Sequence, residues 1–217
     1  MNNLNNMNFP KTKNFLLVFL IIFSYLISVV KTYAVDITAD RTISSSSDGD
    51  QYNIKTNNDI DVIVTNNSTL ERNQKIFNVS AASLTGSSIT IHLGSSVIAE
   101  TNSIFSNGAE LTITNTGTIE ATNSKAINVS NSDGVSITNN NNGVIKSNNN
   151  TILGDAGTGA DNVTIDNSGE IFTTATGTES SAIVFANNDT GNTITNNSGG
   201  EIYSSGSEST IVLGVSQ

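Results

Sequence analysis

The chain contains a single histidine, His92, and imidazole is the side chain most often used for acid–base catalysis and metal binding near neutral pH. His92 lies in the segment Ile91-His92-Leu93, where alternation of apolar and polar residues predicts that its side chain points outward. The sequence around it carries no nucleophile-elbow motif and no metal-ligand spacing. We therefore interpret His92 as a solvated surface residue.

Paired carboxylates are the second kind of chemistry to consider. Glycosidases use two acidic residues about 5–9.5 Å apart. Glu120 and Glu170 are expected at the same outward position of different repeats, with Lys146 at that position between them. Two coils at the strand spacing would separate the carboxylates by about 10 Å. We interpret them as spaced surface charge, and a carbohydrate-active enzyme, a polysaccharide lyase or a glycosidase, is the alternative.

Metal chemistry has little support in the sequence. Asp155 and Asp161 lie in a glycine-rich turn whose oxygens could ligate calcium. This turn does not repeat the Gly-Gly-x-Gly-x-Asp pattern, which must recur to build calcium sites. The chain has no cysteine, which excludes disulfides and thiolate metal sites. The sequence therefore predicts no catalytic, cofactor-binding or metal-binding residue and no cofactor.

These side chains are positioned by a repeat that occupies most of the chain. An Ile-Thr-Asn or Ile-Asp-Asn phrase, followed by glycine and then by a lone isoleucine, occurs at 113–119, 137–145, 165–171 and 194–202. Each unit holds three short segments with the period-2 alternation of β-strands. Such strands bury their apolar faces only when units stack coil upon coil. The expected fold is all-β, a right-handed parallel β-helix with three short strands per coil and about five to six coils.

An asparagine recurs in each unit, and we predict that these asparagines form a ladder at one corner of the coil. Asparagine tolerates the left-handed backbone that a sharp corner requires. Its side-chain amide can also hydrogen-bond to the amide one coil away. Including a looser upstream copy of the phrase, the predicted ladder consists of Asn66, Asn115, Asn139, Asn167 and Asn196.

Residues 1–34 are typical of a secretory signal peptide, so the export machinery is an expected partner. Lys11 and Lys13 precede an apolar run over 15–30, and small residues precede an expected cleavage between Ala34 and Val35. Residues 35–58 lack the repeat and are expected to form a partly irregular N-terminal cap segment, followed by the β-helix over 59–217. The net charge is −10, and the leader holds three lysines but no acidic residue. This balance disfavours nucleic acid and anionic membranes as partners.

The signal peptide and the repeated phrase resemble the passenger domain of bacterial autotransporters, in particular of adhesins. The matching coils are Ile113 to Ile119 with Ala126-Ile127, and Ile165 to Ile171 with Ala182-Ile183. The resemblance covers roughly residues 60–217. It implies a non-enzymatic protein, secreted or at the cell surface of a Gram-negative bacterium, with an adhesion or stalk role. A host or environmental surface glycan or protein would be its partner.

The chain departs from the family at its C-terminal end. Autotransporters carry a C-terminal membrane β-barrel, whereas this sequence stops at Gln217 within the repeat pattern. We therefore expect a passenger that is truncated at the C-terminus and reaches the outer membrane only if a barrel is supplied elsewhere. A non-functional truncated remnant is a further alternative.

Overall fold

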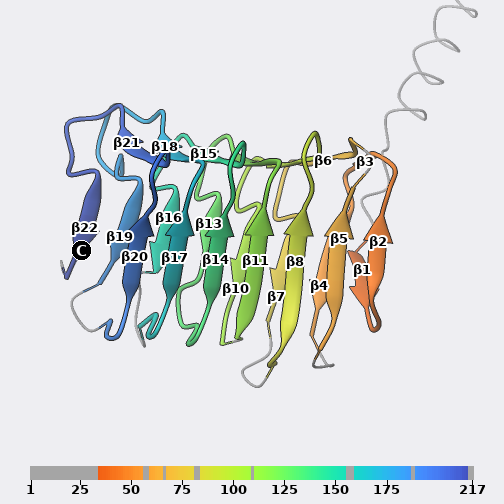
Figure 1. Ribbon diagram of the computed structural model, residues 1–217. Coiled ribbons are helices and arrows are strands. Elements are labelled where there is room, and N and C mark those ends of the chain that lie inside the picture. Colours follow the sequence, from red (N-terminus) through yellow and green to blue (C-terminus); the bar gives the residue numbers. More distant parts are fainter. Residues whose placement is uncertain are drawn as a thin grey trace, which may run out of the picture. The chain divides into compact units, whose positions relative to one another are not determined.

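The computed structural model describes residues 34–55, 59–65, 67–80, 84–108, 110–154, 159–186 and 189–214, and the statements below concern these residues. They form strands, turns and bends without a helix (Figure 1). The predicted signal peptide lies outside the described residues except for Ala34. Asn66 and Asp155 also lie outside them.

The strands are arranged in three parallel sheets (Figure 1). Sheet A has the order β1 (Ala34–Ile37), β4 (Gln51–Ile54), β7 (Phe77–Val79), β10 (Ile104–Ser106), β13 (Ile127–Asn128), β16 (Ile152–Gly154), β19 (Ile183–Phe185) and β22 (Ile211–Leu213). Sheet B has the order β2 (Arg41–Ile43), β5 (Asp61–Val64), β8 (Ser87–Ile91), β11 (Leu111–Asn115), β14 (Ser136–Asn139), β17 (Thr164–Asn167) and β20 (Thr193–Asn196). Sheet C contains β3 (Ser47–Asp48), β6 (Thr69–Arg72), β9 (Ser96–Ala99), β12 (Thr118–Ala121), β15 (Val144–Ser147), β18 (Glu170–Thr173) and β21 (Glu201–Ser204).

Successive strands visit sheets A, B and C in turn, so each set of three makes one coil. This confirms a parallel β-helix with three strands per coil. Strands β5 to β22 place six strands in each sheet, which agrees with the five to six coils expected after residue 59.

The β-helix begins earlier than the predicted boundary at residue 59. Within the expected cap segment, Ile37 of β1 pairs with Ile54 of β4, and Ile43 of β2 pairs with Val64 of β5. Strands β1 to β4 therefore belong to the same sheets as the repeat. The reason is that parallel pairing requires apolar alternation and not the Ile-Thr-Asn phrase, so this segment joins the stack without it.

Isoleucine columns fill the interior. In sheet B the column consists of Ile89, Ile113, Ile137 and Ile165; in sheet C of Ile119, Ile145 and Ile171; in sheet A of Ile104, Ile127, Ile152 and Ile183. All of these side chains are fully buried. Because each buried isoleucine contributes about 1.5–3 kcal/mol relative to an exposed one, these columns favour the stacking of the coils.

The asparagine ladder and the candidate binding surfaces

Four of the predicted asparagines hydrogen-bond to one another in a continuous chain inside the stack. The Nδ2 of Asn115 donates to Oδ1 of Asn139 at 2.8 Å, and Nδ2 of Asn139 donates to Oδ1 of Asn167 at 2.8 Å. Asn167 continues the series to Asn196 at 2.7 Å. The first three are fully buried, so the ladder is an internal polar column within an otherwise apolar core.

Each amide also closes the turn that follows it. Nδ2 of Asn115 donates to the carbonyl of Gly117 at 3.2 Å, and its Oδ1 accepts the backbone N–H of Gly117 at 3.1 Å. A further bond, at 3.2 Å, joins Nδ2 to the carbonyl of Val144 in the next coil. Asn167 makes the same pair of bonds with Gly169, so the spacing Asn-x-Gly of these two coils has a physical reason: the side chain replaces the backbone partners that the turn lacks.

The expectation that the ladder asparagines have a left-handed backbone is wrong. Among the described residues the asparagines with positive φ are Asn67, Asn131, Asn142 and Asn162, and none of them belongs to the ladder. Asn115, Asn139, Asn167 and Asn196 each end a strand of sheet B. Asparagine is used there because its amide satisfies buried hydrogen bonds, and not because it tolerates an unusual φ.

The ladder also starts later than predicted. The register places Asn115 opposite Ile91, and Ile91 opposite Val64. Val64 in turn lies opposite Ile43. The position that carries asparagine in the last four coils is thus aliphatic in the first three, and Val64 rather than Asn66 occupies it.

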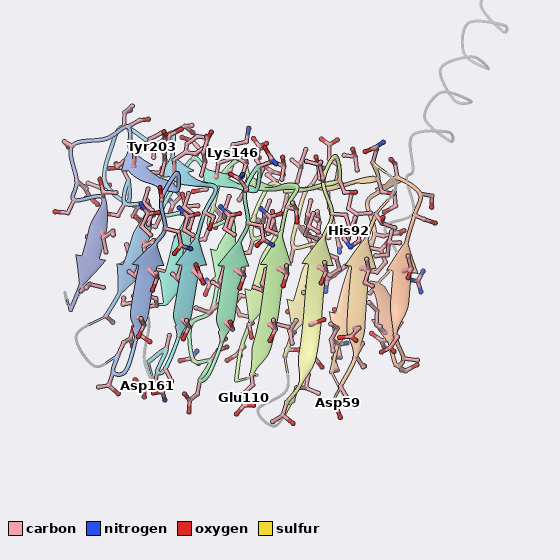
Figure 2. All side chains as sticks on the ribbon, in the orientation of Figure 1. Asp59, His92, Glu110, Lys146, Asp161 and Tyr203 are labelled. Carbon is pink, nitrogen blue, oxygen red and sulfur yellow. The ribbon has the colours of Figure 1, made fainter. Side chains whose placement is uncertain are left out.

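The outward face of sheet C combines charges and aromatic rings. One column in register consists of Glu120, Lys146, Phe172 and Tyr203. Nζ of Lys146 lies 3.0 Å from a carboxylate oxygen of Glu120, and the rings of Phe172 and Tyr203 stack with centroids 4.7 Å apart. Lys146 and Tyr203 both lie on this side of the stack (Figure 2).

The expectation that Glu120 and Glu170 share one outward position is wrong. Glu170 lies opposite Val144 and Glu201, whereas Glu120 lies opposite Lys146. The two glutamates flank the central isoleucine of their strands on different sides, so they belong to different columns. The neighbouring carboxylates are instead those of Glu170 and Glu201, which line an open pocket of about 370 Å³.

The carboxylates of Glu170 and Glu201 affect the pKa of Tyr203. Partial burial raises the pKa of the Tyr203 phenol, and the charges of Glu170 and Glu201 and a hydrogen bond to Glu170 raise it further. Because the folded state keeps this proton to a higher pH than the unfolded chain, the associated stability is present below the ordinary tyrosine pKa. It is lost as pH rises through the folded-state pKa.

We expect the substitution Glu170→Gln to lower the pKa of Tyr203, since it removes one of the two negative charges that raise this pKa. The measurement is a phenolate absorbance titration of the full chain, with Tyr203→Phe used to isolate the Tyr203 signal. Glu120→Gln is the matched control, because Glu120 is paired with Lys146. An unchanged pKa in Glu170→Gln would contradict this electrostatic account.

The outward face of sheet B presents two columns of mostly hydroxyl side chains. One consists of Ser88, Thr112, Ser136, Thr164 and Thr193, and the other of Thr90, Thr114, Thr138, Asp166 and Thr195. All are exposed or half-exposed. Neighbours along a column are about 4.8 Å apart, which is the spacing between parallel strands. The structure thus brings together a regular polar surface spanning five coils.

The remaining candidate residues do not assemble into a site. His92 is exposed, and its Nδ1 lies 3.4 Å from Oγ1 of Thr65. Asp161 lies along a row of turns with Asp59 and Glu110 (Figure 2), and its Oδ1 accepts the backbone N–H of Thr190 at 2.6 Å. The described residues contain no group of three or more acidic or histidine side chains that could hold a metal ion. They also contain no helix that could cross a membrane.

The expected cleavage point, between Ala34 and Val35, lies in strand β1. Ala34 pairs with Gln51, and Val35 pairs with Tyr52.

The three parallel sheets place the chain in the class of parallel β-helix proteins. Comparisons with protein-family models, with curated proteins and with solved structures found no match.

Proposed function

We propose that this chain is an exported, non-enzymatic β-helical protein of the autotransporter-passenger type, which serves adhesion or forms a stalk at the surface of a Gram-negative bacterium or in its surroundings. The observation that carries the proposal is the pair of hydroxyl columns on sheet B, which continue in register over five coils. The signal-like leader and the family resemblance of the repeats support export.

Adhesion suits such a surface for a physical reason. Threonine is stiff at χ1 because it is β-branched, and the parallel register repeats its hydroxyl and methyl groups at a constant spacing. A glycan or protein surface with repeated polar groups would make many weak contacts, whose combined affinity exceeds that of any single contact. The surrounding acidic charge disfavours nucleic acid as the target.

A binding assay tests the proposal. The full chain is produced in a Gram-negative host, and the exported product is applied to cells and to a panel of surface glycans and extracellular proteins. Mass spectrometry of the product checks cleavage between Ala34 and Val35. We expect saturable binding that weakens at least about tenfold, or 1.4 kcal/mol, when Thr114→Lys and Thr138→Lys are combined on sheet B.

The matched control is Thr118→Lys, an outward threonine of sheet C in the same coil as Thr114. Circular dichroism of each variant verifies that the β-structure is retained. Equal weakening by the control would contradict sheet B as the binding face. Absence of saturable binding to every target would contradict the adhesion role.

The adjacent carboxylates of Glu170 and Glu201 favour one alternative, a carbohydrate-active enzyme. Incubation of the same preparation with acidic polysaccharides separates the two functions. Turnover that is abolished by Glu170→Gln or by Glu201→Gln would replace the proposed function.

Circular dichroism tests the other alternative, a non-functional truncated remnant. We expect a cooperative thermal loss of β signal from a folded β-helix.

A further inference from the structure

The chain contains two asparagine–glycine pairs, Asn107-Gly108 and Asn142-Gly143. Asparagine is a chemically labile residue, and a following glycine favours attack by its own backbone nitrogen, because no Cβ atom blocks the approach. Both asparagines are exposed, and both pairs lie in connections between strands. The sequence alone therefore gives no reason why one pair should react before the other.

The glycine of the second pair is fixed by the stack. The N–H of Gly143 donates to the carbonyl of Asn140 at 2.8 Å. The carbonyl of Gly143 accepts Nδ2 of Asn139 at 3.1 Å and the N–H of Glu170 at 2.9 Å. Gly143 is also buried, and a Cβ atom there would lie 2.3 Å from Oδ1 of Asn139. Gly143 therefore cannot shift toward the side chain of Asn142 unless these hydrogen bonds break.

The glycine of the first pair lacks such contacts. The N–H of Asn107 donates to the carbonyl of Val79 at 2.9 Å, which holds the asparagine at the end of β10. Within the described part of the chain, the N–H of Gly108 donates no hydrogen bond, and Gly108 is partly exposed. The nitrogen of Gly108 can therefore lose its proton to water and approach Cγ of Asn107 through local motion alone.

We propose that Asn107 is a site of spontaneous deamidation in the folded protein, whereas Asn142 is protected by its coil. The deprotonated nitrogen of Gly108 forms a bond to Cγ of Asn107, the Cγ–Nδ2 bond breaks, and the amide takes up a proton and leaves as ammonia. Water then opens the resulting succinimide ring. Its hydroxyl adds to either ring carbonyl, and its hydrogen returns to the ring nitrogen. The product is aspartate or isoaspartate, and either form adds a negative charge.

The modification changes a defined place in the fold. Asn107 lies in the connection between β10 and β11 that also contains Glu110. Glu110 lies along the row of turns with Asp59 and Asp161 (Figure 2), so the new carboxylate makes an already acidic row more acidic. In the isoaspartate form the main chain passes through the former side chain, which lengthens this connection. The inference is independent of the adhesion face, since it uses no outward side chain of sheet B.

The test is incubation of the full chain in heavy-oxygen water at mildly alkaline pH, followed by tryptic digestion and tandem mass spectrometry. Trypsin separates the two pairs onto different peptides, 76–125 and 126–146. Hydrolysis of the succinimide leaves a heavy oxygen at the modified residue. We expect label to appear at Asn107 at least about tenfold faster than at Asn142, which corresponds to a barrier difference of about 1.4 kcal/mol.

Two controls separate the fold from the local sequence. In urea the hydrogen bonds at Gly143 are lost, so we expect Asn142 to react at a rate comparable with that of Asn107. In the folded chain, Asn107→Gln is expected to remove the label from this position, because glutamine would have to close a larger ring. Asn142→Gln is the matched variant and is expected to leave the labelling of Asn107 unchanged. Circular dichroism verifies that both variants retain the β-structure.

Each other result overturns the proposal. Absence of label at Asn107 in the folded chain does so directly. Equal or faster labelling of Asn142 in the folded chain shows that its coil does not protect it. A difference that persists unchanged in urea assigns the reactivity to the neighbouring sequence and not to the fold. Labelling of Asn107 in a preparation that binds no target contradicts the adhesion role alone, so the two proposals fail separately.

Discussion

The substitution Gly169→Ala is expected to destabilise the β-helix by about 3 kcal/mol, at the upper end of the cost of overpacking a dense interior. A Cβ atom at this position would lie 2.2 Å from the carbonyl oxygen of Gly143 and 2.6 Å from that of Asn140. It would also lie 2.8 Å from Nδ2 of Asn139. Two of these three atoms belong to the backbone, so relief requires the coils to move apart.

Urea denaturation followed by circular dichroism measures this effect as a lower midpoint at an unchanged slope. The control is Gly177→Ala, since a Cβ atom there would meet nothing within 4 Å. Neither glycine has a positive φ, so the comparison isolates steric contact. We expect Gly177→Ala to be neutral or to stabilise the protein by about 0.4–1 kcal/mol. Similar losses in both variants would contradict the close-packed turn.

The substitution Asn139→Leu is expected to cost about 2–4 kcal/mol. Leucine has nearly the shape of asparagine, but it leaves Nδ2 of Asn115 without its acceptor and Oδ1 of Asn167 without its donor. It also removes the hydrogen bonds to the carbonyls of Gly143 and Glu170. Each buried group that loses its partner costs about 1–3 kcal/mol, and the remaining bonds of the neighbours reduce the sum.

The same denaturation experiment measures this loss. Asn141→Leu provides the control, because Asn141 is an exposed asparagine in the following turn and such a surface change stays within about 0.5 kcal/mol. If Asn139→Leu were as stable as the unmodified chain, the ladder would be a consequence of stacking and not one of its causes.

The architecture was predictable because its determinants are local. Alternation around Ile113, Ile137 and Ile165 identified short strands, and the return of the phrase indicated stacking. The cap segment was harder to predict. Ile37 and Ile43 occupy the same kind of buried position as the later isoleucines, but no repeated phrase marks them, and so the start of the β-helix was placed too late.

The candidate surfaces were less predictable. Phe172 and Tyr203 are 31 residues apart in the sequence and nothing in either segment indicates that their rings stack. Glu120 and Glu170 were assigned to one column because both adjoin a central isoleucine. The hydroxyl columns had a usable signal in the Thr-Ile-Thr pattern at 112–114 and 193–195, which repeats the outward residues on both sides of an inward one.

The sequence by itself determined which side chains face the interior, because in a strand the direction of each side chain follows from its parity along the chain. Only the tertiary structure decided which residues become neighbours between coils. The ladder bonds join residues 24, 28 and 29 positions apart, since the turns differ in length while the strands stay in register. That variable offset decides where the ladder begins and which charges pair on sheet C.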